Sequence, residues 1–208
     1  MSVETWVVFA LTETALCLTP GPAVLLVLSQ GLTRGAAASL WSNLGILSGN
    51  ACYFVLSATG LGALLIASAE LFSIVRWVGG AYLAWLGLTA FFGASPVLSV
   101  APAADASTSR RRTFFNGVVL QAANPKALVF FTALLPQFIG PRAPVIVQVT
   151  ILGVTSVAIE FFVLLAYGVL AGRMTAVAAR PRFRTLANRV AGTMLVTAGV
   201  GMARLERA

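Results

Sequence analysis

Charge is scarce in this sequence: charged residues make up 10% of its 208 residues, against roughly 25% in a typical soluble domain. Hydrophobic residues make up 59%. With so few charges, the chain could not cover a water-exposed surface. Three stretches without any charge, Thr14–Thr33, Gly35–Ala69 and Trp77–Ala104, each reach the ~20 residues needed to cross a bilayer. The composition predicts an integral membrane protein.

Other absences narrow the functional classes. The chain has no histidine, and its two cysteines, Cys17 and Cys52, lie inside apolar runs, which argues against a disulfide framework, a metal site or a bound cofactor. No Lys or Arg precedes the first apolar run, so a cleavable signal peptide is not expected. The net charge of +8 comes from basic residues in short connections, where orientation in the membrane and anionic lipid explain them better than nucleic acid does.

Windows of about 19 residues predict six transmembrane helices. They lie near Thr5–Ser29, Leu40–Ile66, Phe72–Phe92, Phe114–Phe138, Val145–Leu170 and Leu186–Arg204. A polar linker at 94–113, with two prolines and three consecutive arginines, separates a first three-helix repeat at 1–93 from a second at 114–208. The predicted fold class is an all-α integral membrane protein.

The arginines predict the orientation, because positive residues of short loops stay in the cytoplasm. The connections after the first, third and fifth helices carry nine arginines and the opposite side carries four. The nine are Arg34, Arg110, Arg111, Arg112, Arg173, Arg180, Arg182, Arg184 and Arg189, and the four are Arg76, Arg142, Arg204 and Arg207. We therefore expect the protein in the inner (plasma) membrane with both termini outside the cytoplasm.

The two halves resemble each other in sequence. Aligning Gly45 with Gly153 also pairs Phe54 with Phe162 and Gly60 with Gly168, and further on Gly80 and Gly87 fall on Gly192 and Gly199. Three helices per half is an odd number, so the second half must enter the membrane from the other face. The pattern predicts an inverted-topology repeat, an architecture of transporters.

The first and fourth predicted helices are interrupted by proline at corresponding places. One carries Thr19-Pro20-Gly21-Pro22 and the other Asn124-Pro125-Lys126. Proline removes a backbone donor and clashes with the preceding turn, so both helices should kink or unwind there. Irregular backbone at membrane depth is tolerated where it is buried in protein or lines a cavity. Paired interruptions in two repeats predict the substrate site.

Three ionisable residues, Glu13, Lys126 and Glu160, fall within the predicted spans and should face the protein interior. Lys126 could meet a substrate carboxylate, and Glu160 an ammonium group or a proton. The alternative is a Lys126–Glu160 ion pair that only holds two helices together. Glu13 is a secondary candidate, more easily explained as interfacial near the outer face. Secondary candidates are also Asn43, Asn50 and Gln121, which could line the cavity or bond between helices.

These motifs, with Gly80-Ala81-Tyr82-Leu83, Phe130-Phe131 and Pro136-Gln137-Phe138, resemble the LysE/RhtB translocators over nearly the whole chain. The resemblance implies six helices and export of amino acids from the cytoplasm, with protons as the coupling ion and a homodimer as one allowed assembly. It also implies an acid in the fifth helix, where Glu160 lies. It implies a transporter and not an enzyme.

Two other functions were weighed against amino-acid export. Efflux of an inorganic cation would need several converging carboxylate, thiol or imidazole ligands, whereas this chain has no His and few acids in its spans. A membrane oxidoreductase would need paired thiols, but Cys17 and Cys52 have no counterparts in the second half.

Overall fold

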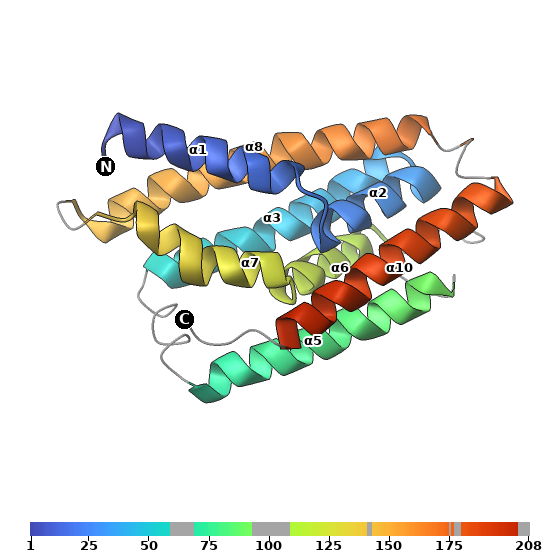
Figure 1. Ribbon diagram of the computed structural model, residues 1–208. Helices are drawn as coiled ribbons and strands as arrows, with labels where there is room; N and C mark the ends of the chain where they lie inside the picture. Colours follow the sequence, from blue (N-terminus) through green and yellow to red (C-terminus); the bar gives the residue numbers. More distant parts are fainter. Residues whose placement is uncertain (59–68, 93–108, 141–142, 175, 177–179, 204–208) are drawn as a thin grey trace.

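A computed structural model describes residues 1–58, 69–92, 109–140, 143–174, 176 and 180–203, and every regular element among them is a helix. The first half contains α1 (Val3–Leu18), α2 (Pro22–Arg34), α3 (Ala36–Ala58) and α5 (Ala69–Phe91). The second half contains α6 (Arg110–Ala122), α7 (Pro125–Val129), the π-helix η1 (Phe130–Leu134), the 3-10 helix η2 (Leu135–Phe138), α8 (Val145–Arg173) and α10 (Pro181–Ala203). The helices lie roughly along one common axis in an elongated bundle (Figure 1).

Each of the six predicted segments corresponds to a helix or to a bent pair of helices. α8 begins at Val145, as predicted, and α5 and α10 start a few residues before their predicted positions. The predicted end of the second segment at Ile66 and most of the 94–113 linker lie outside the described residues. α6 begins at Arg110, before the predicted Phe114, because the Ser109 hydroxyl caps its first turn by accepting from the Arg111 amide.

By length and hydropathy, α8 is the one described helix that could cross a membrane by itself; two bent pairs, α1 with α2 and α6 with α7–η2, raise this number to three. A shorter apolar stretch covers Trp77–Phe91 in α5. α3 is less apolar because it carries Ser39, Ser42, Asn43 and Asn50, all of which are buried inside the bundle. Its polar side chains therefore face protein and leave the outer surface apolar.

The direction of the chain alternates from pass to pass (Figure 1). α1 and α2 run away from the end that holds the N-terminus, α3 returns, and α5 runs away again. In the second half α6 with α7 returns, α8 runs away and α10 returns. α10 therefore runs back toward the end of the bundle at which α1 begins.

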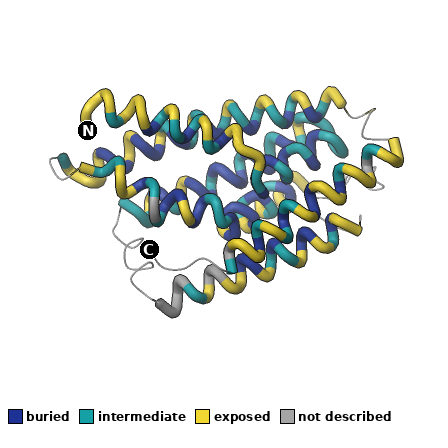
Figure 2. The backbone as a smooth tube through the Cα atoms, in the orientation of Figure 1, coloured by how far each residue is buried: buried dark blue, intermediate teal, exposed yellow. Residues whose placement is uncertain are grey.

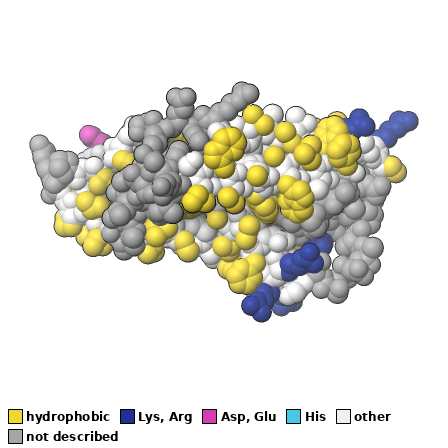
Figure 3. Space-filling view, turned by 90° about the horizontal axis from the view of Figure 1, so that it is seen from below, with side chains coloured by type: hydrophobic (Ala, Val, Ile, Leu, Met, Phe, Trp, Pro, Cys, Tyr) yellow, Lys and Arg dark blue, Asp and Glu magenta, His cyan; other side chains and the backbone are white. Residues whose placement is uncertain are grey.

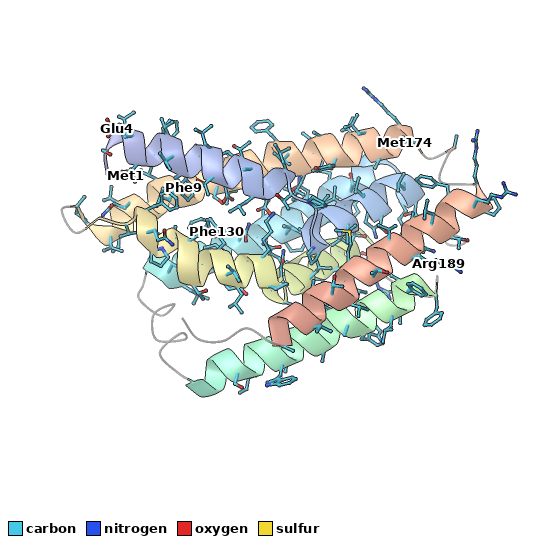
Figure 4. The ribbon with its side chains drawn as sticks, viewed as in Figure 1. Met1, Glu4, Phe9, Phe130, Met174 and Arg189 are labelled. Carbon is cyan, nitrogen blue, oxygen red and sulfur yellow. The ribbon has the colours of Figure 1, made fainter. Side chains whose placement is uncertain are left out.

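The two ends of the bundle differ in charge. Exposed arginines gather at one end, where Arg110 lies 5.8 Å from the centre of the Trp41 ring and Arg189 lies 5.9 Å from that of Phe91. Figure 3 shows basic side chains at this end of one face and an acidic side chain at the other, with apolar surface between them. Glu4, near the start of α1, is at the opposite end from Met174 and Arg189 (Figure 4).

Buried residues face the centre of the bundle and exposed ones its outside (Figure 2). α5 and α10 pack against each other through glycines: a Cβ on Gly80 would lie 2.9 Å from the Gly199 carbonyl oxygen, and one on Gly87 would lie 2.7 Å from that of Gly192. Larger residues would force these backbones apart, since no flexible side chain is there to move. Gly45 and Gly117 bring α3 and α6 together in the same way.

Candidate functional site

The first break separates α1 from α2 at Thr19–Gly21, and the two helices meet at an angle of 53°. Thr19 is extended, and Gly21, also extended, is the N-cap of α2 with Pro22 behind it in the first turn. Proline is favoured there because its missing amide hydrogen has no helical partner in any case. The N-terminal turn of α2 has no side-chain cap, so backbone N–H groups remain available at this point.

The second break separates α6 from α7 and has the same form. The helices bend by 49°, Asn124 is the N-cap of α7, and Pro125 follows it. Asn124 Oδ1 accepts a hydrogen bond from the Lys126 amide at 3.1 Å. Beyond α7 the helix widens into the π turns of η1 and then tightens into the 3-10 turns of η2, which contains Pro136. Irregular helical turns of this kind often lie at functional sites. Both predicted breaks are therefore present.

Side chains from other helices donate to backbone carbonyl groups at each break, where regular helical hydrogen bonds end. The Lys126 ammonium donates to the carbonyl oxygens of Leu16 and Thr19 at the end of α1. Tyr167 of α8 donates its hydroxyl to the Leu18 carbonyl oxygen at 3.0 Å, and Tyr53 of α3 donates to that of Ala122 at 2.8 Å. A cation at a helix C-terminus also stabilises the helix dipole.

A small cavity lies between the two breaks. Its walls come from α1, α2, α3, α6, α7, η1 and α8. Gly21 at the first break and Asn124 at the second both line it. The lining residues are Glu13, Leu16, Cys17, Gly21, Ala23, Val24, Asn50, Gln121, Asn124, Lys126, Ala127, Phe130, Phe131, Glu160 and Leu164. The cavity has a volume of about 40 Å³. This is room for a few water molecules, since each needs about 10–15 Å³. The structure therefore leaves only a narrow space around these polar side chains.

A chain of amide side chains connects Glu160 to the second break. Asn50 Nδ2 donates to the Glu160 carboxylate. Gln121 Nε2 donates to Asn50 Oδ1 at 2.6 Å, and Asn124 Nδ2 donates to Gln121 Oε1 at 3.0 Å. Because Asn124 also caps α7, the position of Glu160 is coupled to the start of the half-helix that carries Lys126.

Glu13 lies in the same cavity and is 5% exposed. Its Oε1 accepts a hydrogen bond from the Ser156 hydroxyl of α8 at 2.6 Å and a longer one from the Cys17 thiol at 3.7 Å. The expectation that Glu13 is interfacial is wrong: Ser156, 143 residues away in sequence, gives the carboxylate a buried partner. The cavity thus contains two carboxylates and one ammonium group.

The structure brings most of the sequence-predicted residues together, in different ways. Gly21, Asn50, Gln121, Asn124, Lys126, Glu160 and Glu13 line the cavity. Thr19, Pro20, Pro22 and Pro125 are not among the lining residues and act through the bends that they impose. Asn43 does not line it either, because its amide donates to the Phe161 carbonyl oxygen and joins α3 to α8.

The alternative ion pair between Lys126 and Glu160 is not formed. Both residues are described, and Lys126 donates to backbone carbonyls while Glu160 accepts from Asn50. Their charges nevertheless face one cavity. A substrate placed between Lys126 and Glu160 could therefore contact both side chains.

Sequence reasoning did not identify Ser156, Tyr53 or Tyr167 as parts of the site. Hydroxyl side chains recur along α3 and α8, and no local pattern distinguishes these three from the others. The one signal in the sequence is a tyrosine at the same membrane depth as a helix break. A carbonyl group at the break that has no helical partner needs a donor, and the tyrosine hydroxyl can supply it.

The two thiols are apart in the structure: Cys17 is buried in the cavity wall and Cys52 is exposed on α3, and both are free. Among the described residues, no group of three or more His, Cys, Asp or Glu side chains is placed to hold a metal ion. Neither the thiol pair of an oxidoreductase nor a multidentate cation site is built from this part of the chain.

Apolar helices around a small polar cavity, with two helices broken at its level, are typical of membrane transport proteins. The chain belongs to the LysE type translocator family, whose model matches residues 14–205. It is 33% identical over 210 residues to a homoserine/homoserine lactone efflux protein of Salmonella typhimurium, covering 100% of both chains. It is also 33% identical to a Vibrio cholerae membrane protein over 98% of each.

A leucine efflux protein of Salmonella choleraesuis is 26% identical over 91% of this chain and 90% of its own. No solved structure matches the chain. The relatives with named substrates therefore differ in the side chain of the amino acid that they move.

Proposed function

We propose that this protein exports amino acids, or close derivatives of them, from the cytoplasm, with a proton moving in the opposite direction. The observation that carries the proposal is one small cavity, between two broken helices, that is lined by Lys126 and two buried carboxylates. An amino acid is a zwitterion, so it offers a charge of each sign. Charges inside a membrane protein are costly unless they are paired or functional.

The carboxylate of the substrate would bind on the side of Lys126. The ammonium group has three donors, and two of them already reach the Leu16 and Thr19 carbonyl oxygens. Gly21, Ala23 and Val24, at the uncapped start of α2, line the same cavity. The N-terminus of a helix favours an anion, so Lys126 and α2 together provide a suitable site.

The ammonium group of the substrate would bind at Glu160, which Asn50 orients, with Glu13 as the second carboxylate. The apolar side chain of the substrate would then contact Leu16, Phe130, Phe131 or Leu164. With room for only a few waters at present, the cavity must expand to accept a substrate. The bends at Thr19–Gly21 and Asn124 are natural hinges for this expansion.

Competition for a carboxylate provides the coupling. A proton and a substrate ammonium group cannot both occupy the same Glu160 oxygens. If a proton enters from outside when the substrate has left, and the substrate displaces it inside, each transport cycle exchanges one for the other. No separate ion site is then required.

We further propose that the chain forms six spans arranged as an inverted repeat. The alternation of chain direction in Figure 1 supports it, because the second half begins from the opposite end. The glycine contacts support it too: Gly80 meets Gly199 and Gly87 meets Gly192, and the sequence alignment makes Gly80 equivalent to Gly192 and Gly87 to Gly199. Reciprocal contacts between equivalent residues are what a two-fold axis produces.

The topology gives a testable prediction. Because arginines gather at one end of the bundle and loops rich in positive charge stay inside, both termini should be outside the cytoplasm and the segment 173–189 inside. Reporters that are active on only one side of the membrane, fused after Ala208 and inserted near Arg180, should give opposite signals. A cytoplasmic signal from the C-terminal fusion would contradict both the topology and the inverted repeat.

The proposed function predicts faster export from cells that make the protein. Cells loaded with amino acids, by feeding dipeptides that are cleaved inside, should release at least one of homoserine, threonine, leucine or lysine faster than cells without it. A matched culture should make a Gly87→Leu variant, in which the α5–α10 contact cannot form. Equal release of every amino acid tested by cells with and without the protein would contradict the proposal.

A further inference from the structure

We propose that three phenylalanine rings, Phe9 of α1, Phe130 of η1 and Phe138 of η2, form the outer gate of the transport path. The term outer gate is used below for these three residues. The direction of transport in this inference rests on the proposed function, but the existence of the gate does not. Its role is to separate the central cavity from a vestibule at the end of the bundle where α1 begins.

The vestibule is a hollow at the end opposite the arginines. The vestibule has a volume of about 430 Å³. Its lining residues are Met1, Ser2, Thr5, Gln137, Phe138, Gly140, Ala143 and Gln148. Gln148, which is 1% exposed, holds its wall in place: its amide donates to the Gly140 and Ala143 carbonyl oxygens, and its Oε1 accepts from the Gly140 amide. Ser2, Thr5 and Gln137 give this hollow polar side chains that a polar solute could contact.

The three rings lead in steps from the central cavity to the vestibule. Phe130 lines the cavity and Phe138 lines the vestibule. Phe9, fully buried, contacts both: the ring centres are 6.2 Å apart for Phe130 and 5.1 Å apart for Phe138, the latter edge to face. Figure 4 shows the Phe9 and Phe130 side chains close to each other, between α1 and the segment formed by α7 and η1. The three rings themselves are apolar.

The backbone around the rings favours movement. Phe130 and Phe138 lie on η1 and η2, where π and 3-10 turns replace the regular α-helical hydrogen bonds. Phe9 lies on α1, a half-helix that ends at the first break. An edge-to-face aromatic pair is a weak contact, so the contact between α1 and η2 can close the path and still break when the path opens.

Cys17 provides a direct test, because this native thiol lies in the wall of the central cavity. Replacing the exposed Cys52 by serine leaves Cys17 as the single cysteine of the chain. A charged, membrane-impermeant methanethiosulfonate reagent added outside intact cells can reach Cys17 only when the outer gate is open. The rate of labelling therefore reports the open population of the gate without any transport measurement.

In the Cys52→Ser background, Phe9→Ala and Phe138→Ala should each raise the rate of labelling from outside by about tenfold or more, because access follows the population of the open state. Phe138 is only half-buried, so its replacement is the milder change if Phe9→Ala folds poorly. Phe162→Ala is the matched control, since this phenylalanine is 67% exposed on α8. Labelling from the arginine-rich side, measured in inside-out vesicles, should not rise.

Unchanged labelling from outside in well-expressed Phe9→Ala and Phe138→Ala proteins would overturn the outer gate. An equal rise from both sides would overturn it as well, because it would indicate general loosening. These outcomes are distinct from a failure of the proposed function. If the protein moves no amino acid but shows side-specific labelling, the outer gate is supported and amino-acid export is contradicted.

Discussion

Export should be abolished by Lys126→Ala and reduced but not lost by Lys126→Arg. Lys126 is the single lysine of the chain, and it is the cation of the central cavity, where it also donates to the Leu16 and Thr19 carbonyl oxygens. Alanine removes the charge that would bind a substrate carboxylate. Arginine keeps the charge and donors but is bulkier, so it should fit the small cavity poorly. The measurement is the initial rate of amino-acid export per molecule of protein in the membrane.

Protein stability must be separated from transport in this experiment. Without the ammonium group, the Leu16 and Thr19 carbonyl oxygens lose a charged donor, although the Thr19 amide still donates to Leu16; a hydrogen bond to a charged group contributes about 1.5–3 kcal/mol. Membrane abundance and thermal stability in detergent therefore accompany each rate. Lys126→Met keeps most of the side-chain length without charge, and Arg111→Ala removes an exposed cation at the end of the bundle. Normal export by abundant Lys126→Ala protein would show that Lys126 only caps α1.

The second large effect is expected at Glu160. Glu160→Gln should stop export driven by a proton gradient while it still permits exchange of labelled for unlabelled amino acid across the membrane. Glutamine resembles the protonated carboxyl and can still bond with Asn50, the partner that Glu160 has in the structure. It cannot take up and release a proton, so the coupled cycle should fail. Exchange requires only the steps in which the protein carries a bound amino acid, so it should continue.

Glu4→Gln is the matched control, because it changes an exposed carboxyl at the far end of α1. Glu13→Gln tests the second carboxylate of the cavity, which Ser156 holds. If Glu160→Gln exports at the normal rate with the normal pH dependence, Glu160 is a packing residue. Coupling would then be assigned to Glu13, and an abolished pH dependence in Glu13→Gln would support that assignment.

Much of the fold could be predicted because the decisive signals are local. Pro20, Pro22 and Pro125 cannot fit a continuous helix, and the structure bends at both places. Val145 follows a proline and starts a long apolar run, and α8 begins there. The π and 3-10 turns of residues 130–138 were not predicted, because Pro136 indicates that the helix is disturbed but not how its hydrogen bonds rearrange.

The site was harder to predict because its contacts join distant residues. Lys126 and Glu160 could be recognised from their cost in an apolar span, but their actual partners could not. Glu160 is bonded to Asn50, 110 residues away, and Lys126 to Leu16, also 110 residues away. Glu13 and its partner Ser156 are separated by a still longer stretch of 143 residues. Local patterns identify which residues need a partner, and only packing decides which partner they receive.

Transport by the purified protein in liposomes tests the central claim most directly. The liposomes are loaded with a labelled amino acid that the cells export, and an inward proton gradient is imposed across their membrane. We expect the amino acid to leave faster than from liposomes without protein, to slow when a protonophore dissipates the gradient, and to be retained when the protein carries Lys126→Ala. Efflux equal to that of protein-free liposomes, for every amino acid that cells with the protein release, would contradict the account.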